Sequence, residues 1–333
     1  MTQARLPGNR PPAFDACKFK GRKTVTRAQG SRPQAAVAIS PQAAKLEELL
    51  KQAPKQIDLP LPQKRAAGEH AEDLSSEPED VAYEDAPEVG GLWAKPAGAR
   101  EDAVIMYLFG GGYTISSPHS RRKFAGHLAR AAGTRALVPD YALAPEHPFP
   151  GAIESALSAY RFLLDGGFAA GRIFVAGDSS GGGLAAATLL AIRRAGLPLP
   201  GGAVAISPWA DLAFTGRTFG ALAAVDLTVT KGGLERMGAD YLAGADPRDP
   251  LASPIFGDFS GLPPLLIVVG GYEGFLDDAV NLARQAAIGG VDVSLRVFAG
   301  MQHVFPIYAG FLPEADAAIA LLGSWIRARL EAR

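Results

Sequence analysis

The segment Gly177-Asp178-Ser179-Ser180-Gly181 constrains the fold of this chain more than any other feature. It lies between an apolar run, Ile173 to Ala176, and an Ala/Leu-rich run from Leu184 that is typical of a helix. Glycine two residues before and two after a serine, at a strand-to-helix junction, is the pattern of a nucleophile elbow, a strained turn beside which only hydrogen side chains fit. We therefore predict that Ser179 is a nucleophile.

The pattern alone is weakly specific, because a chain with 39 glycines can contain it in an ordinary Gly/Ser loop. The order of the other chemically active residues favours the catalytic interpretation. A glycine-rich segment precedes the serine, and carboxylates and then a histidine follow it, which is one of the known chain orders for a serine, acid and histidine triad.

The base is predicted from position. Of the histidines at 70, 119, 127, 147 and 303, only the last follows the elbow with acidic residues in between. It comes after the strand-like run Val291 to Phe298 and the turn Ala299-Gly300, so it belongs on a loop at the C-terminal edge of a strand. The alternative is a loop histidine that only caps the next helix. We predict His303 as the base.

Three carboxylates compete for the role of the acid. The apolar run Pro264 to Val269 ends at two glycines, and Glu273 follows directly. The acid must stand at the end of the strand and accept the Nδ1 proton of the histidine, which favours Glu273. Asp277 and Asp278 are more simply interpreted as first-turn helix acids, and Asp277 remains the alternative acid.

Three consecutive glycines, Gly110 to Gly112, follow the apolar run Ala103 to Leu108. Such a segment lets backbone amides approach a ligand oxygen, and we predict an oxyanion hole from the amides of Gly110, Gly111 and Ser180. A phosphate-binding loop is the competing interpretation. It is disfavoured because neither the lysine of a P-loop nor the spaced G-x-G-x-x-G pattern is present.

Composition excludes several classes of protein. The chain has 333 residues, a formal net charge of −1 and one cysteine, Cys17, so an intramolecular disulfide is impossible and a cytoplasmic location is expected. No apolar run reaches the roughly 18 residues of a membrane span. No Cys/His cluster suggests a metal, and we expect neither a cofactor nor a nucleic-acid partner.

Downstream of residue 100, strand-like and helix-like segments alternate, which predicts a parallel sheet wound by β-α-β units. The predicted strands are 103–108, 136–141, 172–176, 202–206, 264–269 and 291–298, with an antiparallel start at about 80–97. The predicted helices are 120–132, 151–165, 182–195, 276–288 and 313–331.

The N-terminal part differs from the rest. The first 32 residues carry eight Lys/Arg and one Asp, so residues 1–35 are predicted to be a basic, disordered leader. Ser40-Pro41 then suits the start of a helix, with serine as the N-cap and proline in the first turn. The predicted divisions are the leader, a helical segment at 36–75 and a catalytic domain at 76–333.

From about residue 80 to the C-terminus, the chain resembles the hormone-sensitive-lipase-like family of microbial α/β-hydrolase esterases. Besides the glycine segment and the elbow, the matching segments are Asp140 to Pro150, Ser253-Pro254, Gly261 to Pro264 and Gly300 to Phe305. Two positions depart from the family pattern. Phe109 stands where a histidine is common before the glycines, and Glu273 stands where aspartate is more usual.

The resemblance implies an α/β-hydrolase fold, in which a mostly parallel sheet is flanked by helices. It also implies a helical cap, made here from residues 36–75 and an insertion at about 211–245. The implied activity is that of a serine carboxylesterase acting on small-molecule esters of short to medium chain length through an acyl-enzyme intermediate.

Three aromatic residues beside the catalytic segments are candidates for the substrate pocket: Tyr113, Trp209 and Phe305. Each of them also suits an ordinary core position. The edge strand predicted near 291–298 suggests a homodimer. The alternative functions are a non-catalytic small-molecule receptor on the same fold and a serine amidase or peptidase.

Overall fold

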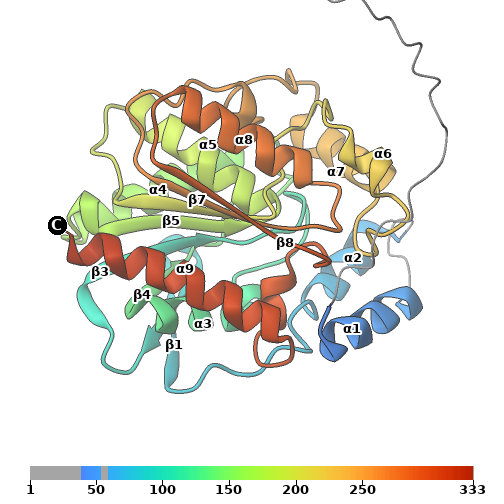
Figure 1. Cartoon of the computed structure of the whole chain (residues 1–333). Coiled ribbons are helices and arrows are strands. Elements are labelled where there is room, and N and C mark those ends of the chain that lie inside the picture. Colours follow the sequence, from blue (N-terminus) through green and yellow to red (C-terminus); the bar gives the residue numbers. More distant parts are fainter. Residues whose placement is uncertain (1–38, 54–58, 333) are drawn as a thin grey trace, which may run out of the picture. The chain divides into compact units, whose positions relative to one another are not determined.

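The computed structural model describes residues 39–53 and 59–332. The predicted leader at 1–35 lies outside these residues. The described residues form a central sheet with helices on both faces (Figure 1).

The sheet has eight strands in the order β1-β2-β4-β3-β5-β6-β7-β8. Strand β2 is antiparallel to both of its neighbours, β1 and β4, and all other neighbouring strands are parallel. The strands are Val81–Ala86 (β1), Gly91–Pro96 (β2), Arg100–Leu108 (β3), Thr134–Val138 (β4), Ile173–Asp178 (β5), Gly202–Ile206 (β6), Leu265–Gly270 (β7) and Val293–Phe298 (β8). The predicted α/β-hydrolase fold is confirmed.

Two layers of helices cover the sheet. Helices α3 (Arg122–Ala132) and α9 (Pro313–Glu331) pack together on one face. Helices α4 (Gly151–Asp165), α5 (Ser180–Arg194) and α8 (Leu276–Ile288) lie on the other (Figure 1). This layering explains why the central strands are apolar along their whole length, since both of their faces are buried.

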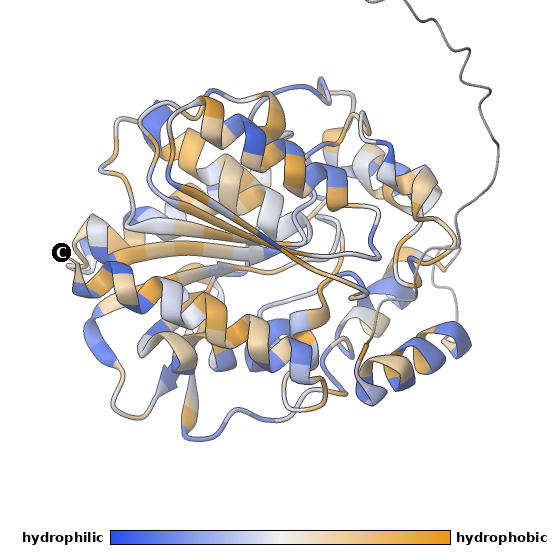
Figure 2. Ribbon diagram, in the orientation of Figure 1, coloured by the Kyte–Doolittle hydropathy of each residue, from blue (hydrophilic) through white to orange (hydrophobic). Residues whose placement is uncertain are grey.

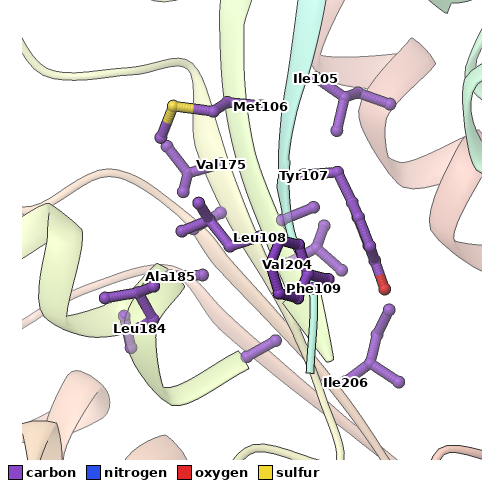
Figure 3. Close-up of a cluster of buried hydrophobic side chains, with 14 of the residues drawn as sticks. Ile105, Met106, Tyr107, Leu108, Phe109, Val175, Leu184, Ala185, Val204 and Ile206 are labelled. Carbon is purple, nitrogen blue, oxygen red and sulfur yellow. The ribbon is translucent and has the colours of Figure 1, made fainter. Parts of the chain in front are cut away.

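The strand that carries the elbow lies among fully buried strands. Every residue of β5, β6 and β7 is buried. In Figure 2 these strands are mostly apolar, whereas the helices around them carry polar residues on their outer faces. Figure 3 shows side chains of β3, β5 and β6 gathered beside Leu184 and Ala185 at the start of α5. The elbow therefore stands on a fully buried, apolar base.

Helices α1 (Pro41–Gln52) and α2 (Leu61–Gly68) precede the sheet in the chain. Ser40 caps α1 as predicted, because its side chain accepts the amide hydrogen of Ala43. The amide and the hydroxyl of Ser40 both donate to Glu314 at the start of α9, at 3.1 and 2.9 Å. These bonds tie α1 to the body of the protein.

The connection from β6 to β7 contains the helices α6 (Thr218–Ala221) and α7 (Lys231–Leu242). The segment at about 211–245, which was predicted to be a cap insertion, lies within this connection. Short 3₁₀ segments and loops elsewhere join the remaining elements, among them Phe305–Tyr308 directly after the histidine loop. Among the described residues, no helix is both long and apolar enough to cross a membrane.

Candidate active site

Ser179 occupies a strained turn at the C-terminal end of β5. Its φ and ψ angles are 53° and −123°, which a residue with a side chain rarely adopts. A Cβ on Gly177 would meet the carbonyl of Gly181, and one on Gly181 would meet the carbonyl of Leu108. Both glycines are therefore required by space, as the elbow pattern predicts.

Three predicted residues from distant parts of the chain meet in a line of hydrogen bonds. The His303 Nε2 atom lies 2.9 Å from the Ser179 Oγ atom, and its Nδ1 atom lies 2.6 Å from the Glu273 Oε2 atom. Ser179 and His303 are only 8% and 9% exposed, and Glu273 is fully buried. The histidine can therefore accept a proton from the serine while the carboxylate fixes its ring.

Glu273 is held by more than the histidine. Its Oε1 atom accepts the hydroxyl of Ser207 at 2.8 Å and the amide of Gly270. Burial raises the pKa of Glu273. The interactions of its carboxylate with His303, Ser207 and Gly270 lower the pKa and offset part of this rise. Ser207 also accepts the amide hydrogen of Val304 at 3.1 Å, so one hydroxyl links the acid to the histidine loop. Ser207 was not predicted as a site residue, although its position directly after β6 was a usable signal.

The two competing carboxylates, Asp277 and Asp278, accept hydrogen bonds from backbone amides. The Oδ2 atom of Asp277 accepts the amides of Arg217 and Thr218, at 2.6 and 3.2 Å. Asp278 is buried and accepts the amides of Ala210 and Asp211. Neither is bonded to the histidine, so the geometry favours Glu273 as the acid.

The glycine segment corrects one prediction. The amide of Gly110 donates a hydrogen bond to the Asp178 Oδ1 atom, at 2.8 Å, and this bond is buried. An amide hydrogen already bonded to a carboxylate is not free to stabilise an oxyanion, so the assignment of Gly110 to the oxyanion hole is wrong. A Cβ on Gly110 would collide with Asp178, which explains the glycine.

The neighbouring amides are free. Within the part of the chain that the structure describes, the amides of Gly111, Gly112 and Ser180 donate to no protein acceptor. Gly111 and Gly112 have φ angles of 141° and 61°, which permit the sharp turn of this loop. We call residues 110–112 the oxyanion loop. Gly112 was not predicted as a donor, because its role depends on how Gly110 is bonded.

The three aromatic residues predicted to line the pocket lie in the core. Tyr113, Trp209 and Phe305 are 1%, 0% and 0% exposed. The ring of Tyr113 stacks on Tyr241 of α7 at a centroid distance of 3.8 Å, and Phe305 packs on Phe298. In this conformation none of the three presents an open surface to a ligand.

Other side chains lie closer to the reacting groups. The ring of Phe275 lies 4.7 Å from the His303 ring, between centroids. The side chain of Met237, on α7, fills the space beside Gly112. Neither residue was predicted as a site residue, because their positions depend on the insertion and the acid loop folding over the site.

Comparison with known proteins agrees with this geometry. A family model described as the α/β hydrolase fold matches residues 105–307, a span that contains Ser179, Glu273 and His303. The chain belongs to the α/β-hydrolase family. An acetyl-hydrolase of Streptomyces hygroscopicus is 43% identical over 274 residues, which is 78% of this chain and 92% of that protein. An esterase of Acinetobacter venetianus is 32% identical over 225 residues, 67% of this chain and 74% of that protein.

Solved structures place this α/β-hydrolase within the family more narrowly. The crystal structure of an esterase from the bacterial hormone-sensitive lipase family is 40% identical and has a TM-score of 0.84. The match covers 88% of this chain and 100% of the esterase chain. The resemblance to hormone-sensitive-lipase-like esterases is confirmed, and the protein is a carboxylic ester hydrolase.

Proposed function

We propose that this α/β-hydrolase cleaves short- to medium-chain carboxylic esters through an acyl-enzyme on Ser179, with His303 as the base and Glu273 as the acid. The single observation that carries the proposal is the unbroken line of hydrogen bonds from Ser179 through His303 to Glu273, at 2.9 and 2.6 Å. The arrangement is enclosed, which strengthens its electrostatic interactions.

In the first half of the reaction, His303 Nε2 takes the Ser179 proton while the Ser179 Oγ atom attacks the ester carbonyl carbon. The charge that develops on the carbonyl oxygen is stabilised by the amides of Gly111, Gly112 and Ser180. The C–O bond to the alcohol then breaks, and the imidazolium protonates the departing oxygen.

In the second half, water attacks the acyl carbon. His303 takes the proton of that water, the bond between the acyl group and the Ser179 Oγ atom breaks, and the proton passes to the serine. The carboxylic acid leaves and the enzyme is regenerated. Glu273 keeps the Nδ1 proton in place throughout, so that Nε2 faces the serine.

The decisive experiment compares the wild type with Ser179→Ala. Crystals of the related esterase EstE5 were soaked with p-nitrophenyl butyrate, and this ester is a suitable substrate here. We expect nitrophenol release by the wild type and a loss of about 10⁶-fold in Ser179→Ala, the size seen when a triad serine is removed. Ligand binding without Ser179-dependent release would favour the receptor alternative, and faster cleavage of the matching anilide would favour an amidase.

The proposed cap consists of residues 36–75, of which the structure describes 39–53 and 59–75, together with the insertion at about 211–245. The insertion is bonded to both catalytic loops. Leu227 donates its amide to Gln302, next to the histidine, at 2.9 Å. Asp226 accepts the amide of Gly274, next to the acid, at 2.8 Å. These bonds support a fixed cover over the site and hence a pocket of limited length.

A chain-length series tests the cover. Because Met237 lies beside Gly112, Met237→Ala should raise kcat/KM for decanoate relative to acetate by about tenfold, the scale of a few methylenes of pocket space. An unchanged preference would show that Met237 does not bound the pocket.

A homodimer and a cytoplasmic location are further parts of the proposal. Strand β8 is an edge of the sheet, and its Leu295 and Val297 are 36% and 39% exposed. Sedimentation should give a dimer for the wild type and a monomer for Val297→Lys. A wild-type monomer would contradict the dimer, and cell fractionation tests the location, which rests on the single cysteine.

A further inference from the structure

Three ionisable side chains are buried behind the oxyanion loop, and the proposed reaction does not use them. Glu72, Arg121 and Asp178 are 4%, 7% and 0% exposed. Charged side chains are rarely buried in this way unless they are paired, because leaving water is costly. We call these three residues the Glu72–Arg121–Asp178 network.

Asp178 forms the end of the network that touches the site. Its carboxylate accepts the hydroxyl of Tyr107 at 2.5 Å, the amide of Gly110 at 2.8 Å and the Nε hydrogen of Arg121 at 3.3 Å. Asp178 directly precedes Ser179. One carboxylate therefore joins the strand that carries the nucleophile to the first residue of the oxyanion loop.

The bond from Gly110 to Asp178 has a consequence for the next two residues. It fixes the orientation of the first peptide of the loop, and the free amides of Gly111 and Gly112 follow directly. The position of these two donors therefore depends on where the Asp178 carboxylate lies.

Glu72 forms the other end, in the N-terminal part of the chain. Its two carboxylate oxygens accept the amides of Lys123 and Phe124, at 2.9 and 3.0 Å, in the first turn of α3. A carboxylate is favourable at that end of a helix. Arg121 directly precedes α3, so Glu72 fixes the point from which Arg121 extends toward Asp178.

Arg121 connects the two ends. Burial by itself would lower the pKa of Arg121, but the nearby Asp178, Glu72 and Tyr107 raise it above its usual value. The guanidinium therefore keeps its charge beside Asp178. If it were lost, the Asp178 carboxylate would remain buried without a counter-charge, which is strongly unfavourable.

We propose that Arg121 and Glu72 are positioning residues for the oxyanion loop, acting through Asp178. They hold the loop in the geometry in which its free amides stabilise the transition state. The inference rests on the proposed function. The segment around Glu72 precedes every strand of the sheet in the chain. According to this proposal, it contributes to catalysis without touching the substrate.

The test uses Arg121→Met with Arg122→Met as its matched control. Arg122 is the next residue, and it pairs at the surface with Glu77 of the same N-terminal segment, at 2.5 and 2.8 Å. For each variant, active sites are counted by titration with a fluorophosphonate. Then kcat and KM are measured per active site with p-nitrophenyl butyrate, together with the Ki of a trifluoromethyl ketone, which forms a tetrahedral oxyanion on the serine.

For Arg121→Met we expect kcat per active site to fall about 10²-fold, the cost of a displacement of roughly 1 Å in a catalytic group. The Ki of the ketone should rise by a similar factor, because its oxyanion uses the same amides. KM should change less than about threefold, since the interaction is made mainly in the transition state. Arg121→Lys, which keeps the positive charge, should recover part of the loss, and Arg122→Met should match the wild type.

A purely structural role gives a different result. The number of titratable sites and the melting temperature would fall, while kcat per site and Ki kept their wild-type values, and this outcome would overturn the inference. If Arg121→Met does not fold, the isosteric Glu72→Gln, with Glu77→Gln as control, takes its place. We expect a fall of about tenfold in kcat per site and a matching rise in Ki, and wild-type values would again overturn the inference.

The two proposals fail separately. If Ser179→Ala turned over the ester as fast as the wild type, the proposed function would be contradicted, whatever the result for Arg121→Met. Ser179-dependent turnover with an unchanged Arg121→Met would contradict only the positioning role.

Discussion

The substitution Glu273→Gln tests the assignment of the acid, and the structure fixes how the amide must sit. Gly270 donates its amide to the Oε1 position, so the carbonyl oxygen of the glutamine must occupy that side. Its NH₂ group then faces His303 Nδ1, where Oε2 now lies at 2.6 Å. An NH₂ group only donates, so Nδ1 must accept and the ring proton moves to Nε2. There it prevents the histidine from taking the Ser179 proton.

The size of the effect follows from this tautomer. The corresponding exchange of aspartate for asparagine in a serine protease triad lowers kcat about 10⁴-fold, which corresponds to about 5.5 kcal/mol of activation free energy. Asp277→Asn is the control, because its oxygen can still accept the amides of Arg217 and Thr218. Asparagine caps backbone amides about as well as aspartate, so kcat should stay within about twofold of the wild type.

The assay is steady-state hydrolysis of p-nitrophenyl butyrate per titrated active site, with circular dichroism and thermal melting to verify the fold. A folded Glu273→Gln with kcat within about tenfold of the wild type, a loss far too small for a wrong tautomer, would refute the reasoning. So would a loss of activity confined to Asp277→Asn.

Three further predictions concern the residues around the site. Ser207→Ala removes the donor to Glu273 and leaves the Val304 amide unpaired, which should lower the free energy of unfolding by about 1–3 kcal/mol in chemical denaturation; an unchanged value would contradict the bridging role. Gly110→Ala forces a Cβ into Asp178 and should reduce both stability and kcat, whereas Gly232→Ala, which has open space around it, should affect neither. Burial raises the pKa of Glu72 to about 7 from 4.5, so the folded state binds this proton more tightly than the unfolded state. The stability that the bound proton provides is complete below about pH 4.5 and is lost as the pH rises through 7. The fall is about 3 kcal/mol, and a denaturation series should show it in the wild type and not in Glu72→Gln; parallel curves would argue against a raised pKa.

The strands of the sheet were predictable because each is a short apolar run with clear boundaries. Predicted 202–206 coincides with β6, and predicted 264–269 differs from β7 by one residue at each end. The strand predicted at 136–141 is instead Thr134–Val138, because Pro139 cannot donate to the ladder and ends the strand. Helix α2 was not predicted separately, since Leu61–Gly68 has no apolar stripe.

The triad residues were predictable from their order along the chain and their positions at strand ends. The use of each backbone amide was not. That Gly110 is bonded to a carboxylate 68 residues away depends on the folded position of Asp178. The same holds for Ser207, which reaches a residue 97 positions further along the chain. Such partners are set by tertiary packing, which local sequence patterns do not encode.

The most direct test of the account is a crystal structure of the enzyme inactivated by a fluorophosphonate. We predict phosphorus bonded to the Ser179 Oγ atom, with the phosphoryl oxygen about 2.7–3.1 Å from the amides of Gly111, Gly112 and Ser180. The Gly110 amide should still donate to Asp178. An adduct on another residue, or a phosphoryl oxygen bound by the Gly110 amide, would contradict the account.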